Sequence, residues 1–184
     1  MQVDSALPDS GGMVSEGDTL QPPMSDLTPI LTAATQSGKL LEAAAKNITS
    51  LLENSTSPND AASIGELVGT GNWTELNNRF FRTIAFGTGG LRGKTIGATV
   101  TSVEQGQPQP LGRPEFPCVG TNAMNFTNIS RATQGLVAYV KEYFATTGQS
   151  GKPSLCICHD TRFFSREFAE LAARVITENG CDAY

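Results

Sequence analysis

The chain has 184 residues, of which 39% are hydrophobic and 17% are charged, and its formal net charge at pH 7 is −5. This composition is typical of a soluble globular protein, and the acidic balance excludes a general attraction to nucleic acid or to an acidic membrane surface. No apolar stretch approaches the roughly 20 residues of a membrane helix, and the N-terminus lacks the features of a signal peptide, which together predict a cytoplasmic protein.

The N-terminal part of the chain divides into a tail and a helical extension. Residues 1–24 are rich in Pro, Gly, Ser and Asp and contain no Lys or Arg, which predicts a disordered tail. Residues 25–82 are predicted to form a helical N-terminal extension. Within it, apolar residues recur at helical spacing over 39–53, a second helix is expected over 61–68, and a third begins after Thr74, a suitable N-cap.

Residues 94–127 contain four of the ten prolines and few apolar clusters. This pattern predicts a long irregular segment with a hairpin over 98–103. Loops of this length are uncommon unless they serve a site or a partner, so a functional role and a simple surface insertion are equal alternatives.

The C-terminal part alternates between helix and strand patterns. A helix is predicted from Asn128 to a terminating Gly148, a buried parallel strand over 154–159, a helix capped by Ser165, and a further strand over 181–184. This order predicts the α/β class, with a partial doubly wound mixed or parallel sheet. Because a parallel strand needs a partner and a covering helix, we expect the chain to be a truncated piece of a larger protein.

The four cysteines are too few for a disulfide framework in a chain of this length. Cys156 and Cys158 lie on the same face of the predicted strand, and we expect both to be small buried core residues. The single histidine, His159, is interpreted as a packing residue rather than a general base. We therefore predict no metal site in the chain.

Residues 86–93, Phe-Gly-Thr-Gly-Gly-Leu-Arg-Gly, are the most informative stretch. Glycines allow backbone N–H groups to approach an anion, and a guanidinium adds a fork of donors suited to phosphate oxygens. A Walker loop ending at Gly93-Lys94-Thr95 would need a glycine where Thr88 stands, and a dinucleotide fingerprint would need glycine or alanine in place of Arg92. A P-loop-like nucleotide-binding protein and a glycine turn without a ligand are the alternatives.

Three motifs occur in a characteristic order: residues 86–93, residues 132–136 (Ala-Thr-Gln-Gly-Leu) and residues 159–169 (His-Asp-Thr-Arg-Phe-Phe-Ser-Arg-Glu-Phe-Ala). Together they resemble domain I of the α-D-phosphohexomutases, in the phosphoglucomutase and phosphomannomutase branch, over residues 74–184. The resemblance implies that residues 83–184 form an incomplete α/β/α domain I.

Members of that family are isomerases of carbohydrate metabolism that move a phosphate between the 1- and 6-positions of a hexose phosphate. The resemblance implies a phosphoserine, a glucose 1,6-bisphosphate intermediate, and a Mg²⁺ ion bound in the second domain. It implies a catalytic role for Arg92 and a wider set of substrate-binding residues. That set is Thr88, Gly89, Gly90, Arg92, Asp160 and Arg162. From the residues alone, a local ion pair between Asp160 and Arg162 that stiffens the turn is favoured over direct substrate contact.

The family's phosphoserine segment, of the type Thr-Ala-Ser-His-Asn-Pro, and its Asp-x-Asp-x-Asp metal loop do not occur in this sequence. We therefore expect the isolated chain to have no mutase activity and its partners to be the missing C-terminal domains of the same protein. A non-catalytic phosphosugar-binding module is the remaining alternative.

Overall fold

The computed structural model describes residues 27–87 and 89–184, and helices make up most of them. The elements are α1 (Leu27–Gln36), α2 (Glu42–Asn54), α3 (Pro58–Gly69), α4 (Trp73–Phe80), β1 (Phe86–Gly87), β2 (Gly90–Leu91), α5 (Ser102–Gln105), the 3₁₀ turn η2 (Pro110–Gly112), α6 (Phe126–Thr146), β3 (Ser154–Leu155), α7 (Ser165–Glu178) and β4 (Asp182–Ala183). None of these helices is long and apolar enough to cross a membrane. The predicted tail over 1–24 lies outside the described residues.

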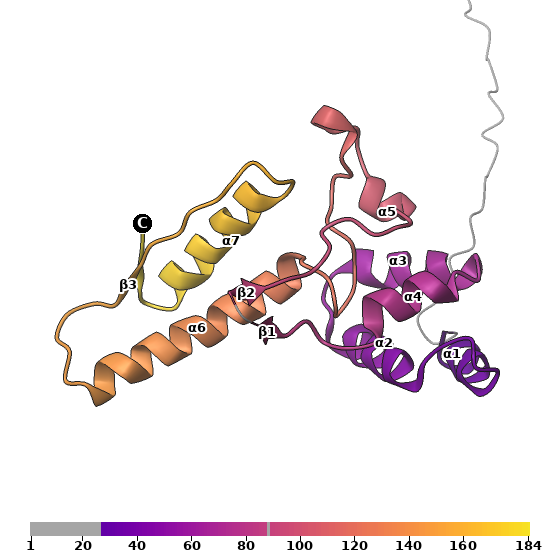
Figure 1. Cartoon of the computed structure of the whole chain (residues 1–184), viewed down its shortest axis with the longest axis horizontal. Coiled ribbons are helices and arrows are strands. Elements are labelled where there is room, and N and C mark those ends of the chain that lie inside the picture. The colour runs from indigo at the N-terminus through magenta and orange to yellow at the C-terminus, as the bar shows by residue number, and fades with distance from the viewer. Residues whose placement is uncertain (1–26, 88) are drawn as a thin grey trace, which may run out of the picture.

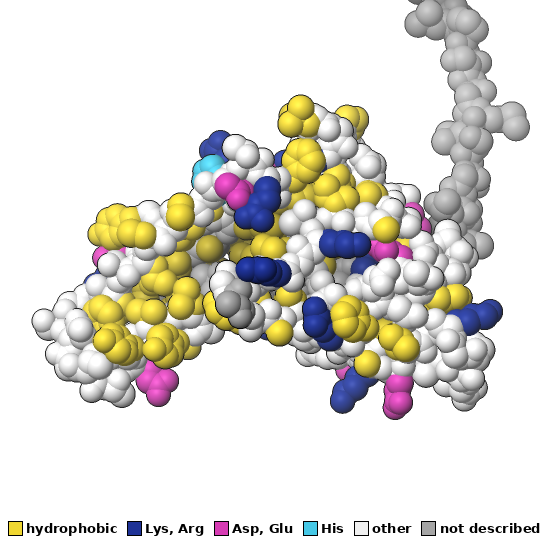
Figure 2. Space-filling model, in the orientation of Figure 1, with side chains coloured by type: hydrophobic (Ala, Val, Ile, Leu, Met, Phe, Trp, Pro, Cys, Tyr) yellow, Lys and Arg dark blue, Asp and Glu magenta, His cyan; other side chains and the backbone are white. Residues whose placement is uncertain are grey.

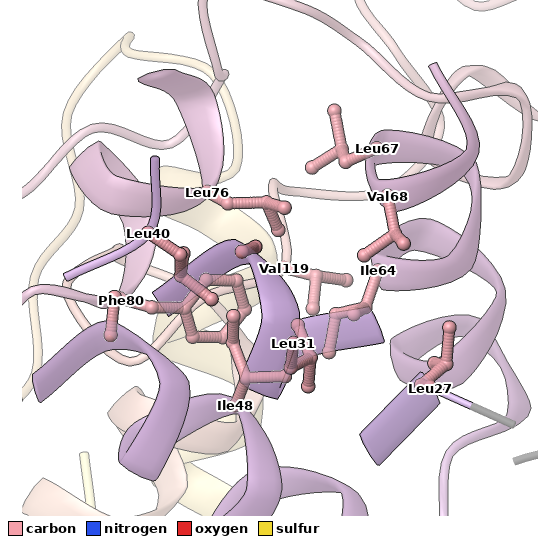
Figure 3. Packing of buried hydrophobic residues seen from close by; sticks show 12 residues of the cluster. Leu27, Leu31, Leu40, Ile48, Ile64, Leu67, Val68, Leu76, Phe80 and Val119 are labelled. Carbon is pink, nitrogen blue, oxygen red and sulfur yellow. The ribbon is translucent and has the colours of Figure 1, made fainter. Parts of the chain in front are cut away.

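Helices α1 to α4 form a bundle at one end of the molecule, and α6 and α7 lie side by side at the other (Figure 1). The bundle core is built from apolar side chains of all four helices (Figure 3). Ile48, Ile64 and Phe80 are completely buried. Since burying one such side chain stabilises a fold by about 1.5–3 kcal/mol, this core secures the N-terminal half. The predicted helices over 39–53 and 61–68 are confirmed with small shifts of their ends.

Two helix starts differ from the prediction. Helix α4 is capped by Asn72, whose side-chain oxygen accepts a hydrogen bond from the backbone N–H of Glu75, and not by Thr74. Asparagine at this position satisfies one of the unpaired N–H groups of the first turn. Ser165 is the first residue of α7, and its N-cap is Phe164, which makes no side-chain cap.

The C-terminal half contains one βαβ unit. Strand β3 pairs in parallel with β4, and α7 connects them. The backbone pairing continues past β3, because the N–H of Ile157 donates to the carbonyl of Tyr184 at 2.8 Å. The buried side chains of Val137, Ile176 and Cys181 join α6 and α7 to this pair.

The described residues contain two sheets of two strands each, so they do not include the doubly wound sheet that the sequence predicts. The strands are only two residues long, and the apolar patterns are used mainly to pack helices against each other. The α/β unit itself is present in the β3–α7–β4 segment. The larger part of the structure is helical.

Residues 94–127 contain no hairpin over 98–103. Thr101 and Glu104 instead form a capping box that starts α5, in which each side chain hydrogen-bonds to the backbone N–H of the other residue. The end of the segment returns to the start, where Lys94 forms a parallel bridge with Ala123. The segment is therefore an ordered excursion held at both ends, and the two prolines nearest its return, Pro114 and Pro117, are buried.

Candidate functional site

The glycine-rich motif forms a tight antiparallel hairpin. Phe86 pairs with Leu91, and Gly87 pairs with Gly90. Gly89 and Gly90 have φ angles of 82° and 116°, a region that side chains with a Cβ rarely adopt. The sequence therefore needs glycine at both positions for the turn itself. Thr88 lies outside the described residues, so its predicted role stays a prediction.

Arg92 leaves the hairpin with its side chain exposed. A Cβ placed on Gly89 would lie 3.4 Å from Arg92 Nη2, so the guanidinium folds back over the turn. Arg92 also lines a cavity of about 350 Å³, together with Arg79, Arg82 and Lys94. The structure thus brings the predicted Arg92 together with two glycines of its own motif.

Gly93 fixes the hairpin to the rest of the protein. A Cβ at this position would lie 2.8 Å from Ile84 Cδ1 and 3.1 Å from the backbone nitrogen of Met124. The carbonyl of the next residue, Lys94, accepts a hydrogen bond from the N–H of Met124 at 2.9 Å. Because only glycine allows this close approach, Gly93 sets the position at which Arg92 leaves the turn.

Asp160 and Arg162 form the local ion pair that the sequence favoured. Arg162 Nε and Nη2 both lie 2.7 Å from Asp160 Oδ2, and the backbone N–H of Arg162 donates to Oδ1 at 3.0 Å. The hydrogen bonds from Arg162 hold the pKa of Asp160 well below its usual range. The Arg162 side chain is 86% exposed, so the pair lies at the surface and Arg162 Nη1 is not engaged in it.

Gly93 and Lys94 join these two motifs. They line the cavity beside Arg92 and also a second cavity of about 430 Å³ that Arg162 lines. Figure 2 shows Lys and Arg side chains gathered over the middle of the molecule, between the helical bundle and the α6–α7 pair. Residues 70 positions apart in the sequence, Arg92 and Arg162, therefore flank the same short segment.

Lys94 was not predicted as a site residue. Its sequence signal is Gly93-Lys94-Thr95, which matches the end of a Walker loop. That alternative requires a helix beginning at this lysine and threonine. The next helix is α5, which begins at Ser102, so the P-loop geometry is absent here.

Two further predictions need correction. Cys156 and Cys158 are exposed rather than buried, because Leu155 and Ile157 occupy the face that packs on α6 and α7. His159 is also exposed, and its Nδ1 lies 3.2 Å from the carbonyl of Asp160, so it is not a packing residue. Within 27–87 and 89–184, no group of three or more His, Cys, Asp or Glu side chains could hold a metal ion, so these residues do not fit a Mg²⁺ site.

Two members of a buried ionic network, Glu75 and Arg79, line the cavity beside Arg92. Arg79, 4% exposed, donates from Nε to Glu75 Oε1 at 2.8 Å and from Nη2 to Glu104 Oε2 at 3.2 Å. Burial opposes both charges, but their hydrogen bonds and mutual attraction outweigh it, raising the pKa of Arg79 and lowering that of Glu104. The sequence signals for this network are the i,i+4 spacing of Glu75 and Arg79 and the capping-box pattern of Thr101 and Glu104.

Comparison with known protein families gives the class of protein to which part of this chain is similar. Residues 118–184 match the family described as phosphoglucomutase/phosphomannomutase, alpha/beta/alpha domain I. The resemblance to the phosphohexomutases is therefore confirmed for this part of the chain. The glycine motif at 86–93 lies before the matched residues.

One curated protein is also similar to part of the chain. The chain is 30% identical over 108 residues to the phosphoribomutase of Saccharomyces cerevisiae, and this match covers 59% of the chain but 13% of the yeast protein. The chain thus spans a small part of that relative's length. No solved structure matches the chain.

Proposed function

We propose that this chain supplies a phosphate-binding part of a sugar phosphomutase site, in an isomerase that transfers a phosphoryl group within a hexose phosphate. The family match over 118–184 supports the class of reaction. The observation that carries the proposal is that Gly93 and Lys94 line the cavities of both Arg92 and Arg162. One sugar phosphate could thus be held between two guanidinium groups.

The chemistry suits these residues. In phosphoryl transfer, negative charge is spread over the phosphoryl oxygens, and a protein contributes mainly by positioning fixed positive charge. Among the described residues, Arg92 and Lys94 form no ion pair with a carboxylate. Asp160 holds the Arg162 guanidinium from one side, which fixes its orientation while Nη1 can donate to a phosphate oxygen.

The reactive groups of the family are not in this sequence. No segment resembles the phosphoserine motif, and the described residues offer no metal site. The family's Mg²⁺ would therefore be held by other domains. We expect the isolated chain to bind glucose 1,6-bisphosphate without turning over glucose 1-phosphate; turnover well above background in a coupled assay would contradict this expectation.

Binding of glucose 1,6-bisphosphate to the purified chain, measured by isothermal titration calorimetry, tests the proposal. A hydrogen bond to a charged group contributes about 1.5–3 kcal/mol, so Arg92→Gln and Arg162→Gln should each weaken binding by about tenfold to a hundredfold. Arg174→Gln, at an exposed position on α7, is the matched control and should leave binding unchanged. Equal affinities for all three variants would refute the assignment of the site.

The sugar class needs its own comparison, because the yeast relative is named a phosphoribomutase. Glucose 6-phosphate and ribose 5-phosphate should be titrated as competitors of glucose 1,6-bisphosphate. We propose a hexose, so glucose 6-phosphate should compete better; stronger competition by ribose 5-phosphate would assign the site to pentoses.

A cytoplasmic location is part of the proposal, since the four cysteines form no disulfide, as expected in a reducing compartment.

A further inference from the structure

The segment that precedes α6 contacts the start of α7 through one arginine. Arg113 Nη2 donates to Glu167 Oε1 at 2.7 Å, and the Arg113 guanidinium carbon lies 4.7 Å from the centre of the Phe164 ring. The Arg113 side chain is 18% exposed. This arginine therefore combines a half-buried ion pair with a cation–π contact on the same short stretch of α7.

Phe164 has an unusual backbone. Its φ angle is 66°, in the left-handed region, although it carries a bulky side chain and is 2% exposed. Such a conformation costs free energy and persists only where the surroundings impose it. The Phe164 ring is packed edge-on against Phe126 at 6.5 Å and lies 6.0 Å from Phe168, while Arg113 covers it.

The strained residue closes the turn that carries Arg162. The N–H of Ser165 donates to the carbonyl of Arg162 at 3.1 Å, and the N–H of Asp160 donates to Ser165 Oγ at 3.1 Å. The left-handed Phe164 lies inside the span of both hydrogen bonds, directly before the first residue of α7. The same turn carries the exposed Arg162 side chain, which lines a cavity together with Gly93 and Lys94.

Arg113 is itself anchored to the bundle. The N–H of Glu115 donates to the carbonyl of Gln105 at 3.0 Å, and the N–H of Phe116 donates to the carbonyl of Glu104 at 3.0 Å. Both acceptors belong to α5, which carries part of the buried ionic network. A continuous path of contacts therefore runs from the bundle through Arg113 to the turn of Arg162.

We propose that Arg113 is a positioning residue for phosphate binding: it holds Phe164 in its left-handed conformation and so orients Arg162. This gives the excursion over 94–127 a role as a strap between the bundle and α7. The inference rests on the proposed phosphate-binding function of Arg162. It goes beyond that function because Arg113 touches the turn and not the phosphate.

Two measurements on the full chain test it. The first is the affinity for glucose 1,6-bisphosphate, which Arg113→Gln should weaken about three- to tenfold, on the scale of mutations that act through packed neighbours. Arg113→Lys, which keeps the positive charge near Glu167 and Phe164, should recover most of this loss. In an Arg162→Gln background, Arg113→Gln should cause no further loss. An equal loss in both backgrounds, or no recovery in Arg113→Lys, would overturn the proposal.

The second measurement, amide hydrogen exchange, does not depend on a ligand. The amides of Arg162 and Ser165 are both hydrogen-bonded within the turn and should exchange faster in Arg113→Gln, while those in the middle of α6 keep their rates. Arg174→Gln is the control. Faster exchange of the turn in a chain that binds no phosphosugar would support the strap and refute the proposed function. Unchanged exchange in Arg113→Gln would overturn the strap.

Discussion

Replacing Glu104 by glutamine keeps the shape of a buried side chain and removes its charge. Glu104 Oε1 accepts hydrogen bonds from Ser63 Oγ at 3.0 Å and the Val119 N–H at 2.8 Å, and Oε2 accepts from the Thr101 N–H at 3.0 Å and Arg79 Nη2 at 3.2 Å. Every one of these partners is a donor to Glu104. A carboxamide NH₂ cannot accept hydrogen bonds, so at least two of the donors lose their acceptor.

The contacts set the size of the effect. Two hydrogen bonds to a charged group contribute about 3–6 kcal/mol together, and removing one partner of a buried ion pair costs about 3–5 kcal/mol. Arg79 keeps Glu75 as a second partner at 2.8 Å, which places the loss near the lower limit, about 3 kcal/mol. For a chain of this size, a loss of about 3 kcal/mol lowers Tm by about 6–12 °C.

Urea unfolding measures this change directly. Trp73 is the single tryptophan of the chain and packs against the bundle core, so its fluorescence reports on the affected region. Glu170→Gln is the matched control, because Glu170 pairs with Arg166 on the exposed surface of α7, where such pairs contribute at most about 1 kcal/mol. If the two variants unfold at the same urea concentration, the buried network does not stabilise the bundle and the reasoning is wrong.

The same substitution predicts a change in the acid response. Burial opposes the ionised form, but the hydrogen bonds and attraction of Arg79 outweigh it and lower the pKa of Glu104 below its ordinary value of 4.5. Its contribution to stability is therefore complete above pH 4.5 and is lost as the pH falls through the lowered pKa. The stability gap between the wild type and Glu104→Gln should shrink over that acid range. A gap that stays constant there would contradict the shifted pKa.

Two further changes test the packing. Cys156 and Cys158 are exposed, whereas burial raises the pKa of Cys118 to about 11. A thiol reagent should therefore modify Cys156 and Cys158 in the native chain and Cys118 only after unfolding. Rapid labelling of Cys118 in the native chain, measured by mass spectrometry, would contradict this. Gly93→Ala places a Cβ 2.8 Å from a side-chain carbon and should lower the free energy of unfolding by about 1–3 kcal/mol. In contrast, Gly135→Ala on α6, where nothing lies within 4 Å, should raise it by about 0.5–1 kcal/mol in urea unfolding. Equal midpoints for these two alanine variants would show that Gly93 is not tightly packed.

Local patterns in the sequence predicted most of the longer helices, and the resemblance to the phosphohexomutases is confirmed over 118–184. The apolar periodicity over 39–53 and in α7 depends only on neighbouring turns of one helix, and Gly180, with a φ of 81°, follows α7 as a terminating glycine should. The ion pair between Asp160 and Arg162 was predictable for the same reason, because two residues of one turn make it.

Long-range contacts explain what the sequence did not reveal. Its neighbours in the sequence make Glu104 look like a polar residue of an irregular segment. In the fold, however, its side chain accepts hydrogen bonds from Ser63 and Arg79, which belong to two other helices. The strand pattern over 98–103 was overridden by the capping box of α5 that this glutamate helps to form. The exposure of Cys156 and Cys158 depends on which face of the strand is covered by helices. Both faces carry apolar side chains, so the alternating pattern alone does not show which face is covered.

The distribution of charge is compatible with the proposed phosphate site in an acidic chain. The net charge of −5 concerns the whole molecule, whereas a bound anion responds mainly to charges within about 10 Å. Three carboxylates of the candidate site and the buried network are already paired with a cation: Asp160 with Arg162, and Glu75 and Glu104 with Arg79. Arg92 and Lys94 are exposed and line the same cavity as Glu75 and Arg79 of this network. The ion pairs that order the fold therefore also leave positive side chains free to meet an anion.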